Sequence, residues 1–222
     1  MKLSILAFLL TISSIATTFA QQMTAEEKTK YEKAITERAE KIVVGLNLAD
    51  QWKSTKVRDI IKDQYSNLND IHSARDLKMK QIKELQKDNK AERDSALAKE
   101  TRNSEIALGK LHKKYIAKLS AQLTSEQVDL VKNGMTYNVL PITYKAYQEE
   151  ILTLTEDQKK QILAWLTEAR EHAMDAESSD KKHAWFGKYK GRINNYLSAA
   201  GYDLKKEGIA WEQRRKAKAG VN

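Results

Sequence analysis

Apolar residues recur along most of the chain at intervals of three and four positions, and no stretch alternates apolar and polar residues as a half-buried strand does. The first helical pattern begins at a capping box, Thr24-Ala25-Glu26-Glu27. Two longer patterns rich in mixed charge follow it, which predicts a hairpin of long helices. The predicted helices cover 24–45, about 49–89 and about 90–119, then shorter segments from Thr124, after Pro141, from Thr155, and over about 181–200 and 203–218.

The composition supports the same fold class. One proline and eight glycines in a chain rich in Lys, Glu, Ala, Leu and Gln favour helix. No linker divides the chain into parts. We therefore expect an all-α, single-domain helical bundle, in which a long helical hairpin is followed by shorter helices.

The first twenty residues, MKLSILAFLLTISSIATTFA, have the features of a secretory signal peptide. Residues 21–222 would then form the mature domain, exported to the periplasm or secreted. No other apolar run approaches the roughly 18 residues that a spanning helix needs, so no membrane anchor is expected. The chain has no cysteine, which excludes disulfides and a lipid-modified cysteine after the leader.

The charge of the chain bears on its partners. Lys and Arg number 39 against 30 Asp and Glu, a net charge of +9. A basic exported protein attracts polyanions, and acidic polysaccharide or lipopolysaccharide is present in that compartment. No nucleic-acid partner is expected there. The alternative is that the charge only keeps the surface soluble.

The pattern L-T-x-x-Q occurs twice, at Leu123–Gln127 and at Leu154–Gln158. Threonine at the N-cap and glutamine three positions later form a capping box, so both copies predict helix starts. Exported chaperones of the envelope-stress type also carry L-T-x-x-Q and are small, helical and basic, and the chain resembles them weakly in these respects.

Polar residues interrupt the apolar stripe of the long helix. The stripe consists of Val57, Ile61, Leu68, Ile71 and Ile82, and Gln64 and Arg75 fall inside it. Tyr65, Asn69 and His72 lie beside it. One interpretation is a polar cleft in which Tyr65, Asn69, His72 and Arg75 face a ligand. The other is that Arg75 pairs with a buried carboxylate in a structural network, or extends its charged end to water.

The segment HAWFGKYKGRINNYLSAAGYDL has the most unusual composition of the chain. Phe186, Ile193, Leu197 and Ala200 are expected in the core. Trp185 and Tyr189 offer flat faces for sugar C–H groups, while Lys188, Arg192 and Asn195 suit hydroxyls and carboxylates. The alternative for the aromatic stripe alone is core packing.

Several constellations of cofactor chemistry are missing. The four histidines show no H-E-x-x-H or other close metal-ligand spacing, so no metal site is predicted. Glycine-rich phosphate loops and a G-x-S-x-G elbow are also absent. No cofactor is expected.

Four segments carry a resemblance to a known family: ITERAEKIV, VRDIIKDQYSNLNDIHSARD, GMTYNVLPITYKAY and ILAWLTEAREHAMDAESSDKKHAWFGKYKGRINNYLSAAGYDLKKEG. They are similar to a largely uncharacterised family of small exported proteins of polysaccharide-degrading bacteria, over nearly the whole mature chain. Members of that family are often labelled sugar-binding and are encoded beside polysaccharide lyases and hydrolases. The resemblance implies an activity that dehydrates uronic-acid oligosaccharides.

The residues suit that chemistry. Elimination across C4–C5 of a uronate needs a base, an acid for the leaving oxygen, and cations that neutralise the carboxylate. The candidate catalytic residues are His72 or His183 as base and Tyr189 or Tyr65 as acid. The candidate substrate-binding residues are Arg75, Arg192 and Lys188 as carboxylate clamp, Asn69 and Asn195 as its support, and Trp185 as stacking platform. A non-catalytic sugar-binding protein is the first alternative, and a chaperone of the L-T-x-x-Q type is the second.

Overall fold

The computed structural model describes residues 24–220, so the predicted leader lies outside the described residues. Those residues form eight α-helices and no strand, which confirms the all-α fold with its long hairpin and shorter helices. The helices are α1 Ala25–Val44, α2 Gln51–Leu85, α3 Lys90–Ser120, α4 Ser125–Met135, α5 Val139–Glu150, α6 Glu156–Met174, α7 Ser179–Ala199 and α8 Leu204–Ala219.

Threonine N-caps begin three of these helices. The hydroxyls of Thr24, Thr124 and Thr155 each accept a hydrogen bond from the backbone N–H three positions later, and the side chain at that position bonds back to the N-cap. Leu123 and Leu154, which precede two of the caps, are buried. Both L-T-x-x-Q copies are therefore capping boxes at helix starts, as predicted.

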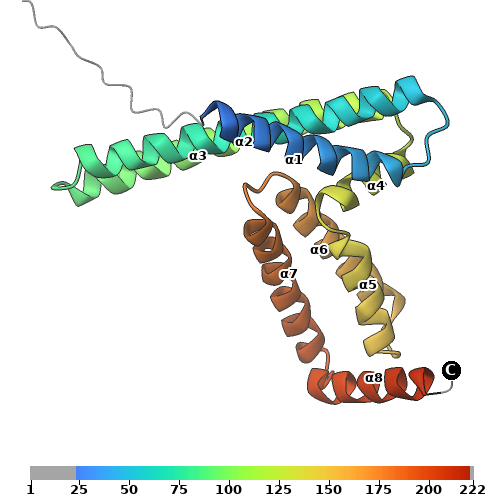
Figure 1. Ribbon diagram of the computed structural model, residues 1–222. Helices are drawn as coiled ribbons and strands as arrows, with labels where there is room; N and C mark the ends of the chain where they lie inside the picture. The colour runs from blue at the N-terminus through green and yellow to red at the C-terminus, as the bar shows by residue number, and fades with distance from the viewer. Residues whose placement is uncertain (1–23, 221–222) are drawn as a thin grey trace, which may run out of the picture.

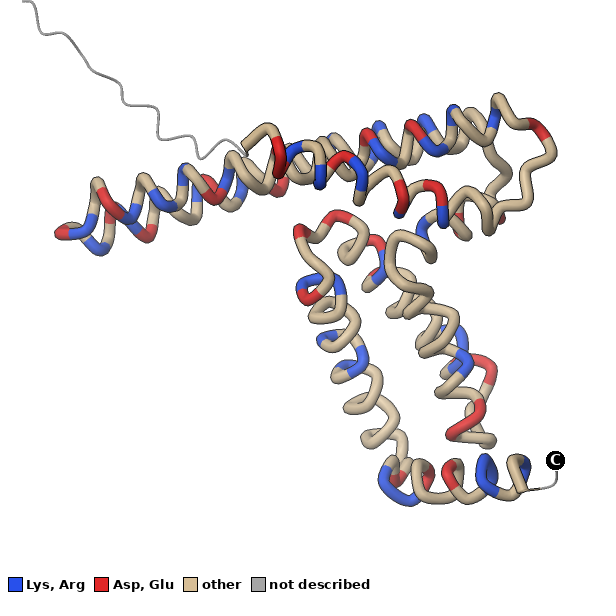
Figure 2. The backbone as a smooth tube through the Cα atoms, viewed as in Figure 1, with Lys and Arg blue, Asp and Glu red and all other residues tan. Residues whose placement is uncertain are grey.

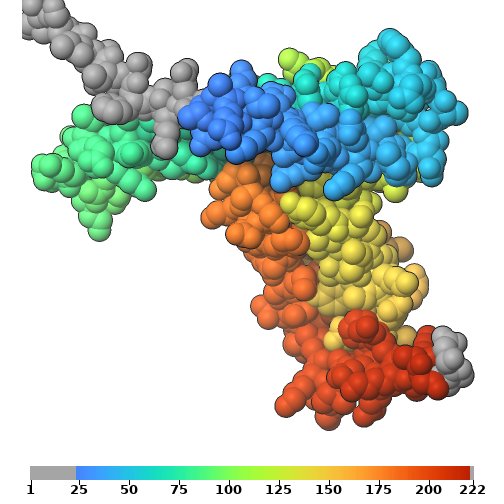
Figure 3. Space-filling view, in the orientation of Figure 1, coloured from blue at the N-terminus to red at the C-terminus, as the bar shows by residue number. Residues whose placement is uncertain are grey.

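The helices form two units (Figure 1). α1, α2 and α3 lie side by side, with α4 packed against α1 and α3; we call α1–α4 the N-terminal unit. α5, α6 and α7 form the C-terminal unit, which extends transversely from the first, and α8 lies across its far end. The described chain consequently has a T-shaped outline (Figure 3).

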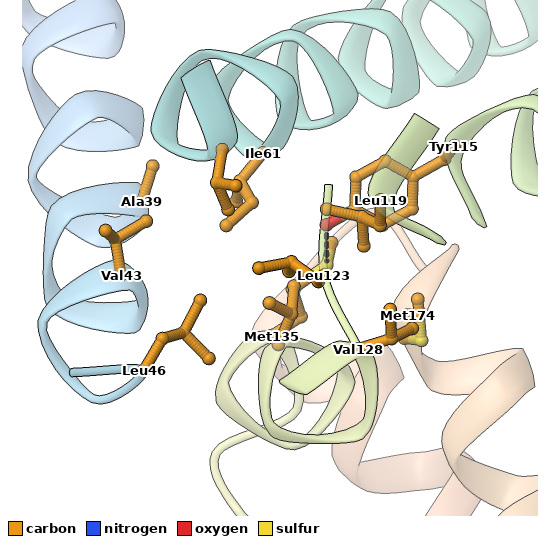
Figure 4. Packing of buried hydrophobic residues seen from close by; sticks show 12 residues of the cluster. Ala39, Val43, Leu46, Ile61, Tyr115, Leu119, Leu123, Val128, Met135 and Met174 are labelled. Atoms are coloured by element: carbon orange, nitrogen blue, oxygen red, sulfur yellow. Dashed lines mark hydrogen bonds between the residues drawn. The ribbon is translucent and has the colours of Figure 1, made fainter. Parts of the chain in front are cut away.

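Each unit has its own hydrophobic cluster. The N-terminal cluster, shown in Figure 4, comprises Ala39, Val43, Leu46, Val57, Ile61, Tyr115, Leu119, Leu123, Val128, Val131, Met135 and Met174. The C-terminal cluster comprises Leu140, Tyr147, Ile151, Leu154, Ile162, Leu166, Ala169, Ala173, Phe186, Tyr189, Ile193 and Leu197. Met174 comes from the last turn of α6, so the C-terminal unit inserts a side chain into the core of its neighbour.

The far half of the α2–α3 hairpin has no core. No side chain between residues 73 and 103 is buried. Of the predicted stripe, Val57, Ile61 and Leu68 are buried, whereas Ile71 and Ile82 are only half-buried. The reason is visible in Figure 1, where the hairpin continues past the end of α1 and no third helix covers it.

Charge is distributed unevenly between the helices. Basic and acidic residues are interspersed along α1–α3, as Figure 2 shows. In contrast, α7 carries five basic residues and one acidic residue, and α8 carries six basic and two acidic residues, so both helices suit an anionic ligand. Within residues 24–220 no helix has an apolar stretch long enough to cross a bilayer.

Candidate active site where the two helical units meet

His72 joins α2 to the turn between α6 and α7. Its Nε2 lies 2.7 Å from the backbone oxygen of Asp175, and its Nδ1 lies 3.1 Å from Nη1 of Arg75. A carbonyl oxygen only accepts hydrogen bonds, and a guanidinium only donates them. Nε2 of His72 therefore carries the proton and donates to Asp175, while Nδ1 accepts a hydrogen bond from Arg75. The side chain is buried, and both ring nitrogens are engaged by the protein. This geometry suits a residue that holds the turn in place.

Arg75 is paired with carboxylates beside the same turn. Its Nη2 lies 2.6 Å from Oδ1 of Asp76 and 3.7 Å from Oε1 of Glu177. The guanidinium thus has acidic neighbours from its own helix and from the α6–α7 turn. Arg75 therefore belongs to an ion-pair network, but its carboxylate partners are exposed rather than buried as that interpretation required.

A charged network next to the turn links α6 to α3 and α4. Nδ1 of His112 lies 2.8 Å from Oδ2 of Asp175, and Nε2 of His112 lies 3.4 Å from Oε2 of Glu171, which also accepts from Lys132 at 2.9 Å. Hydrogen bonds to Asp175 and then Glu171 raise the pKa of His112 to about 9. Burial acts to raise the pKa of Glu171, but hydrogen bonds from His112 and Lys132 outweigh it and lower the pKa to about 2. His112 and Glu171 are therefore both charged at neutral pH.

Lys182, in the first turn of α7, is buried and caps the end of α6. Its Nζ donates to the backbone oxygens of Ala173 at 3.0 Å and Met174 at 3.1 Å, which satisfies carbonyls that the helix leaves free. Burial lowers the pKa of Lys182 to about 8; Asp175 opposes the shift and Arg38 adds to it. A lysine with this pKa exchanges its proton more readily than an ordinary one.

The connection between α4 and α5 is strained. Tyr137 and Asn138 have φ angles of 58° and 55°, a left-handed conformation that is uncommon for residues with side chains. The ring of Tyr137 stacks on His183 of α7, with 5.4 Å between centroids and 12° between planes. Both side chains are exposed. Strain of about 1–3 kcal/mol per residue concentrates at functional sites, so this pair is a candidate for chemistry.

Tyr65 of α2 interacts electrostatically with Arg38 of α1 and with Tyr137. Burial raises the pKa of Tyr65 to about 12, the charge of Arg38 acts against the rise, and Tyr137 adds to it. We call Arg38, Tyr65, Tyr137, Lys182 and His183 the junction site, because they come from α1, α2, α7 and the link between α4 and α5.

A second group of side chains lies along α6 and α7. Trp185 stacks on His172 with 4.3 Å between centroids, and Nζ of Lys188 lies 5.1 Å from the Trp185 ring. The guanidinium of Arg192 lies 4.6 Å from the ring of Trp165. We call Trp165, His172, Trp185, Lys188 and Arg192 the α6–α7 face. His183 and Trp185 are about 200° apart around the helix, so this face and the junction site occupy opposite flanks of α7.

Tyr189 is part of the C-terminal core rather than of either surface. It is buried, and burial followed by its interaction with Glu168 raises its pKa to about 12. Phe186, Ile193 and Leu197 are buried around it, as predicted. Ala200 is exposed, contrary to the prediction, because α7 ends at Ala199.

The structure therefore divides the sequence-predicted site residues into groups. His72 and Arg75 hold the α6–α7 turn, Tyr65 and His183 belong to the junction site, and Trp185, Lys188 and Arg192 belong to the α6–α7 face. Asn69 is half-buried on α2 and Asn195 is exposed on α7.

Sequence reasoning missed Arg38, Tyr137, His172 and Lys182. Lys182 had a signal, because it lies four and eleven positions before Phe186 and Ile193, on the buried line of α7. The other three depend on how the two units meet, which no local pattern encodes.

Neither a metal site nor a catalytic pocket is found elsewhere in the described residues. No group of three or more His, Asp or Glu side chains between residues 24 and 220 could hold a metal ion. A pocket of about 530 Å³ lies at the turn between α1 and α2, and Glu40 and Arg58 line it. These two side chains lie 3.9 Å apart as an ion pair, and no predicted site residue lines the pocket, so it carries no argument for chemistry.

Comparison with profiles of known protein families matches residues 32–217 to the family described as "Protein of unknown function (DUF3826)". No curated protein matches the chain.

Proposed function

The chain belongs to the DUF3826 family, whose function is unknown, and from its own residues we propose that it is an elimination enzyme acting on uronic-acid-containing oligosaccharides. The protein would be exported and would take part in polysaccharide degradation as a dehydratase or a lyase.

The proposed reaction starts with removal of the acidic hydrogen at C5 of the uronate by a base. The electron pair of that C–H bond forms the C4=C5 double bond, and the C4–O bond breaks. An acid protonates the leaving oxygen. If the leaving group is a free hydroxyl, water departs and the enzyme is a dehydratase; if it carries a sugar, the enzyme is a lyase.

The observation that carries the proposal is the junction site. His183 is exposed and stacked on the strained Tyr137, so a substrate can reach its ring. Tyr65, which interacts electrostatically with Tyr137, has a pKa of about 12, so it is protonated at neutral pH and has a proton to give to a leaving oxygen. We assign His183 the role of base and Tyr65 the role of acid.

Cations at the same place support a substrate with a carboxylate. The positive charge of Arg38 acts to lower the pKa of both Tyr65 and Lys182, so Arg38 stabilises negative charge on the proposed acid. As the C5 hydrogen leaves, negative charge builds on the carboxylate, and a fixed guanidinium stabilises it. Arg38 therefore suits the carboxylate clamp better than Arg75, whose guanidinium already pairs with Asp76 and Glu177.

The same reasoning separates the two candidate bases. A base must present a free nitrogen to the substrate. Both nitrogens of His72 are engaged by Asp175 and Arg75, whereas His183 is exposed. His72 then acts indirectly, by holding the turn that precedes α7.

The test is to incubate the purified protein with oligosaccharides that end in a glucuronate. The C4=C5 double bond is conjugated with the carboxylate, so turnover would appear as new ultraviolet absorbance. Mass spectrometry separates the cases: loss of one water from an intact oligosaccharide identifies a dehydratase, and two smaller sugars identify a lyase.

The same experiment addresses the alternatives. Oligosaccharides that bind without any change of absorbance or mass would overturn the elimination and favour a sugar-binding protein. The aromatic and cationic side chains of the α6–α7 face support this alternative. The chaperone alternative has less support, because capping accounts for Thr124, Gln127, Thr155 and Gln158.

A further inference from the structure

The α6–α7 face holds two cation–aromatic pairs next to each other. Nζ of Lys188 lies 5.1 Å from the ring of Trp185, and the guanidinium of Arg192 lies 4.6 Å from the ring of Trp165. Lys188 and Arg192 are four positions apart on α7, so their stems are one helical turn, about 6 Å, apart along the axis. The face thus presents two positive charges in a row.

The aromatic rings restrict where these charges lie. A cation over an indole face gains electrostatic attraction, which limits the conformations of an otherwise flexible side chain. His172 stacks on Trp185 at 4.3 Å and Tyr196 meets Trp165 edge-on at 5.2 Å, so both indoles are themselves fixed. Glu168 lies 3.9 Å from Arg192 but is half exposed, and it neutralises only part of the charge.

Other cation–aromatic pairs of the described residues occur singly. Lys56 lies 4.8 Å from the ring of Trp52 on α2, and Arg215 lies 5.1 Å from the ring of Trp211 on α8. Single pairs of this kind are ordinary features of a protein surface. The adjacency of two pairs, on the helix with five basic residues and one acidic residue, is what distinguishes the α6–α7 face.

We infer that the α6–α7 face is a second binding surface, on which Lys188 and Arg192 bind anionic groups carried by neighbouring residues of an acidic oligosaccharide. The surface lies on the flank of α7 opposite His183, so it is separate from the junction site. The inference rests on the proposed function for the class of ligand, an acidic saccharide. It does not rest on the elimination step, because binding at this face needs no base or acid.

Isothermal titration calorimetry at low salt tests the inference with three probes of equal length: oligogalacturonate, sulfated dextran and neutral dextran. We expect oligogalacturonate to bind and neutral dextran not to bind. Binding of sulfated dextran as well would support recognition of anionic groups in general. Binding of sulfated dextran alone, or equal binding of neutral dextran, would overturn the inference.

The variant K188Q/R192Q should bind oligogalacturonate at least about tenfold more weakly, because two charge-assisted contacts are lost. Lys188 and Arg192 are exposed, so the fold should persist, which circular dichroism would check. K56Q/R215Q is the matched control, since it removes two cations from the single pairs on α2 and α8 and should bind like the parent. Equal affinity of K188Q/R192Q and K56Q/R215Q would refute the second surface.

The two proposals can fail independently. If oligogalacturonate binds through Lys188 and Arg192 but no double bond forms with any uronate oligosaccharide, the face stands and the elimination falls. If double bonds form and K188Q/R192Q binds as tightly as the parent, the elimination stands and the second surface falls.

Discussion

The two helical units bury their side chains in different ways. The N-terminal unit has the longer helices, yet its core is confined to the part where α1, α3 and α4 cover α2, and residues 73–103 contribute no buried side chain. The C-terminal unit has shorter helices, and its core runs from Leu140 to Leu197. Helix length therefore does not determine where this molecule has a hydrophobic core. A core forms only where a third helix covers the pair.

The comparison also explains where the polar residues gather. The junction site and the His112 network lie where the α6–α7 turn and the α4–α5 link meet the long helices. A site assembled from both units depends on their docking, so tests of docking are tests of the site.

The largest effects are expected from cavities in the two cores. Leu119→Ala and Leu166→Ala each remove a side chain that is 0% exposed, one in each cluster, and each should lower the free energy of unfolding by about 2–5 kcal/mol. Because Met174 of α6 belongs to the N-terminal cluster, we expect one cooperative transition in denaturant for both variants. Two transitions, of which each variant shifts only one, would show that the units unfold separately.

The next effect concerns the pH dependence of docking through His112. The folded pKa of about 9 lies above the ordinary value of 6.5, so the folded state binds more protons between these values and stability falls as pH rises through them. From pH 6.5 to pH 8 the free energy of unfolding should fall by on the order of 2 kcal/mol. Urea melts at several pH values would measure it.

His112→Gln is the control for this pH dependence and should flatten the slope of stability against pH between pH 6.5 and pH 8. An unchanged slope in His112→Gln would contradict the role given to the network that joins α3 to α6.

Lys182 affects stability in a different pH range. Its folded pKa of about 8 lies below the ordinary 10.5, so its contribution makes stability rise between pH 8 and pH 10.5.

The smallest effects are expected at the helix caps, one in each unit. Thr124→Ala and Thr155→Ala should each lower the free energy of unfolding by on the order of 1 kcal/mol, since each removes a capping hydrogen bond. Ser125→Ala, next to the first cap and exposed, should change it by less than about 0.5 kcal/mol. Loss of saccharide binding in either threonine variant without loss of stability would give L-T-x-x-Q a role beyond capping.

The sequence predicted the features that depend on local pattern. Helix positions follow from the period of apolar residues, and Thr24, Thr124 and Thr155 begin helices because capping involves neighbours within three positions. The core of α7 was predicted from Phe186, Ile193 and Leu197 for the same reason.

The candidate site was predicted only in part, because it depends on tertiary placement. His72 and His183 are equivalent as residue types, but one has both nitrogens engaged and the other is exposed. Tyr137 gives no sequence signal, since its importance comes from a left-handed backbone and a partner 46 positions away. Helical spacing alone brings Lys188 next to Trp185, but it does not determine which neighbouring helix covers each flank of α7.

The central claim is that elimination takes place at the junction site, and the rate of double-bond formation in single variants tests it most directly. With a saturating glucuronate-terminated oligosaccharide, His183→Ala and Tyr65→Phe should each lower kcat by about 10²-fold or more, because they remove the proposed base and acid. His183→Ala should keep the parent's melting curve, since His183 is exposed, whereas His72→Gln should lose stability, since His72 is buried and bonded to Asp175 and Arg75. A full rate of absorbance increase in His183→Ala and Tyr65→Phe, or no absorbance increase in the parent protein, would contradict the account.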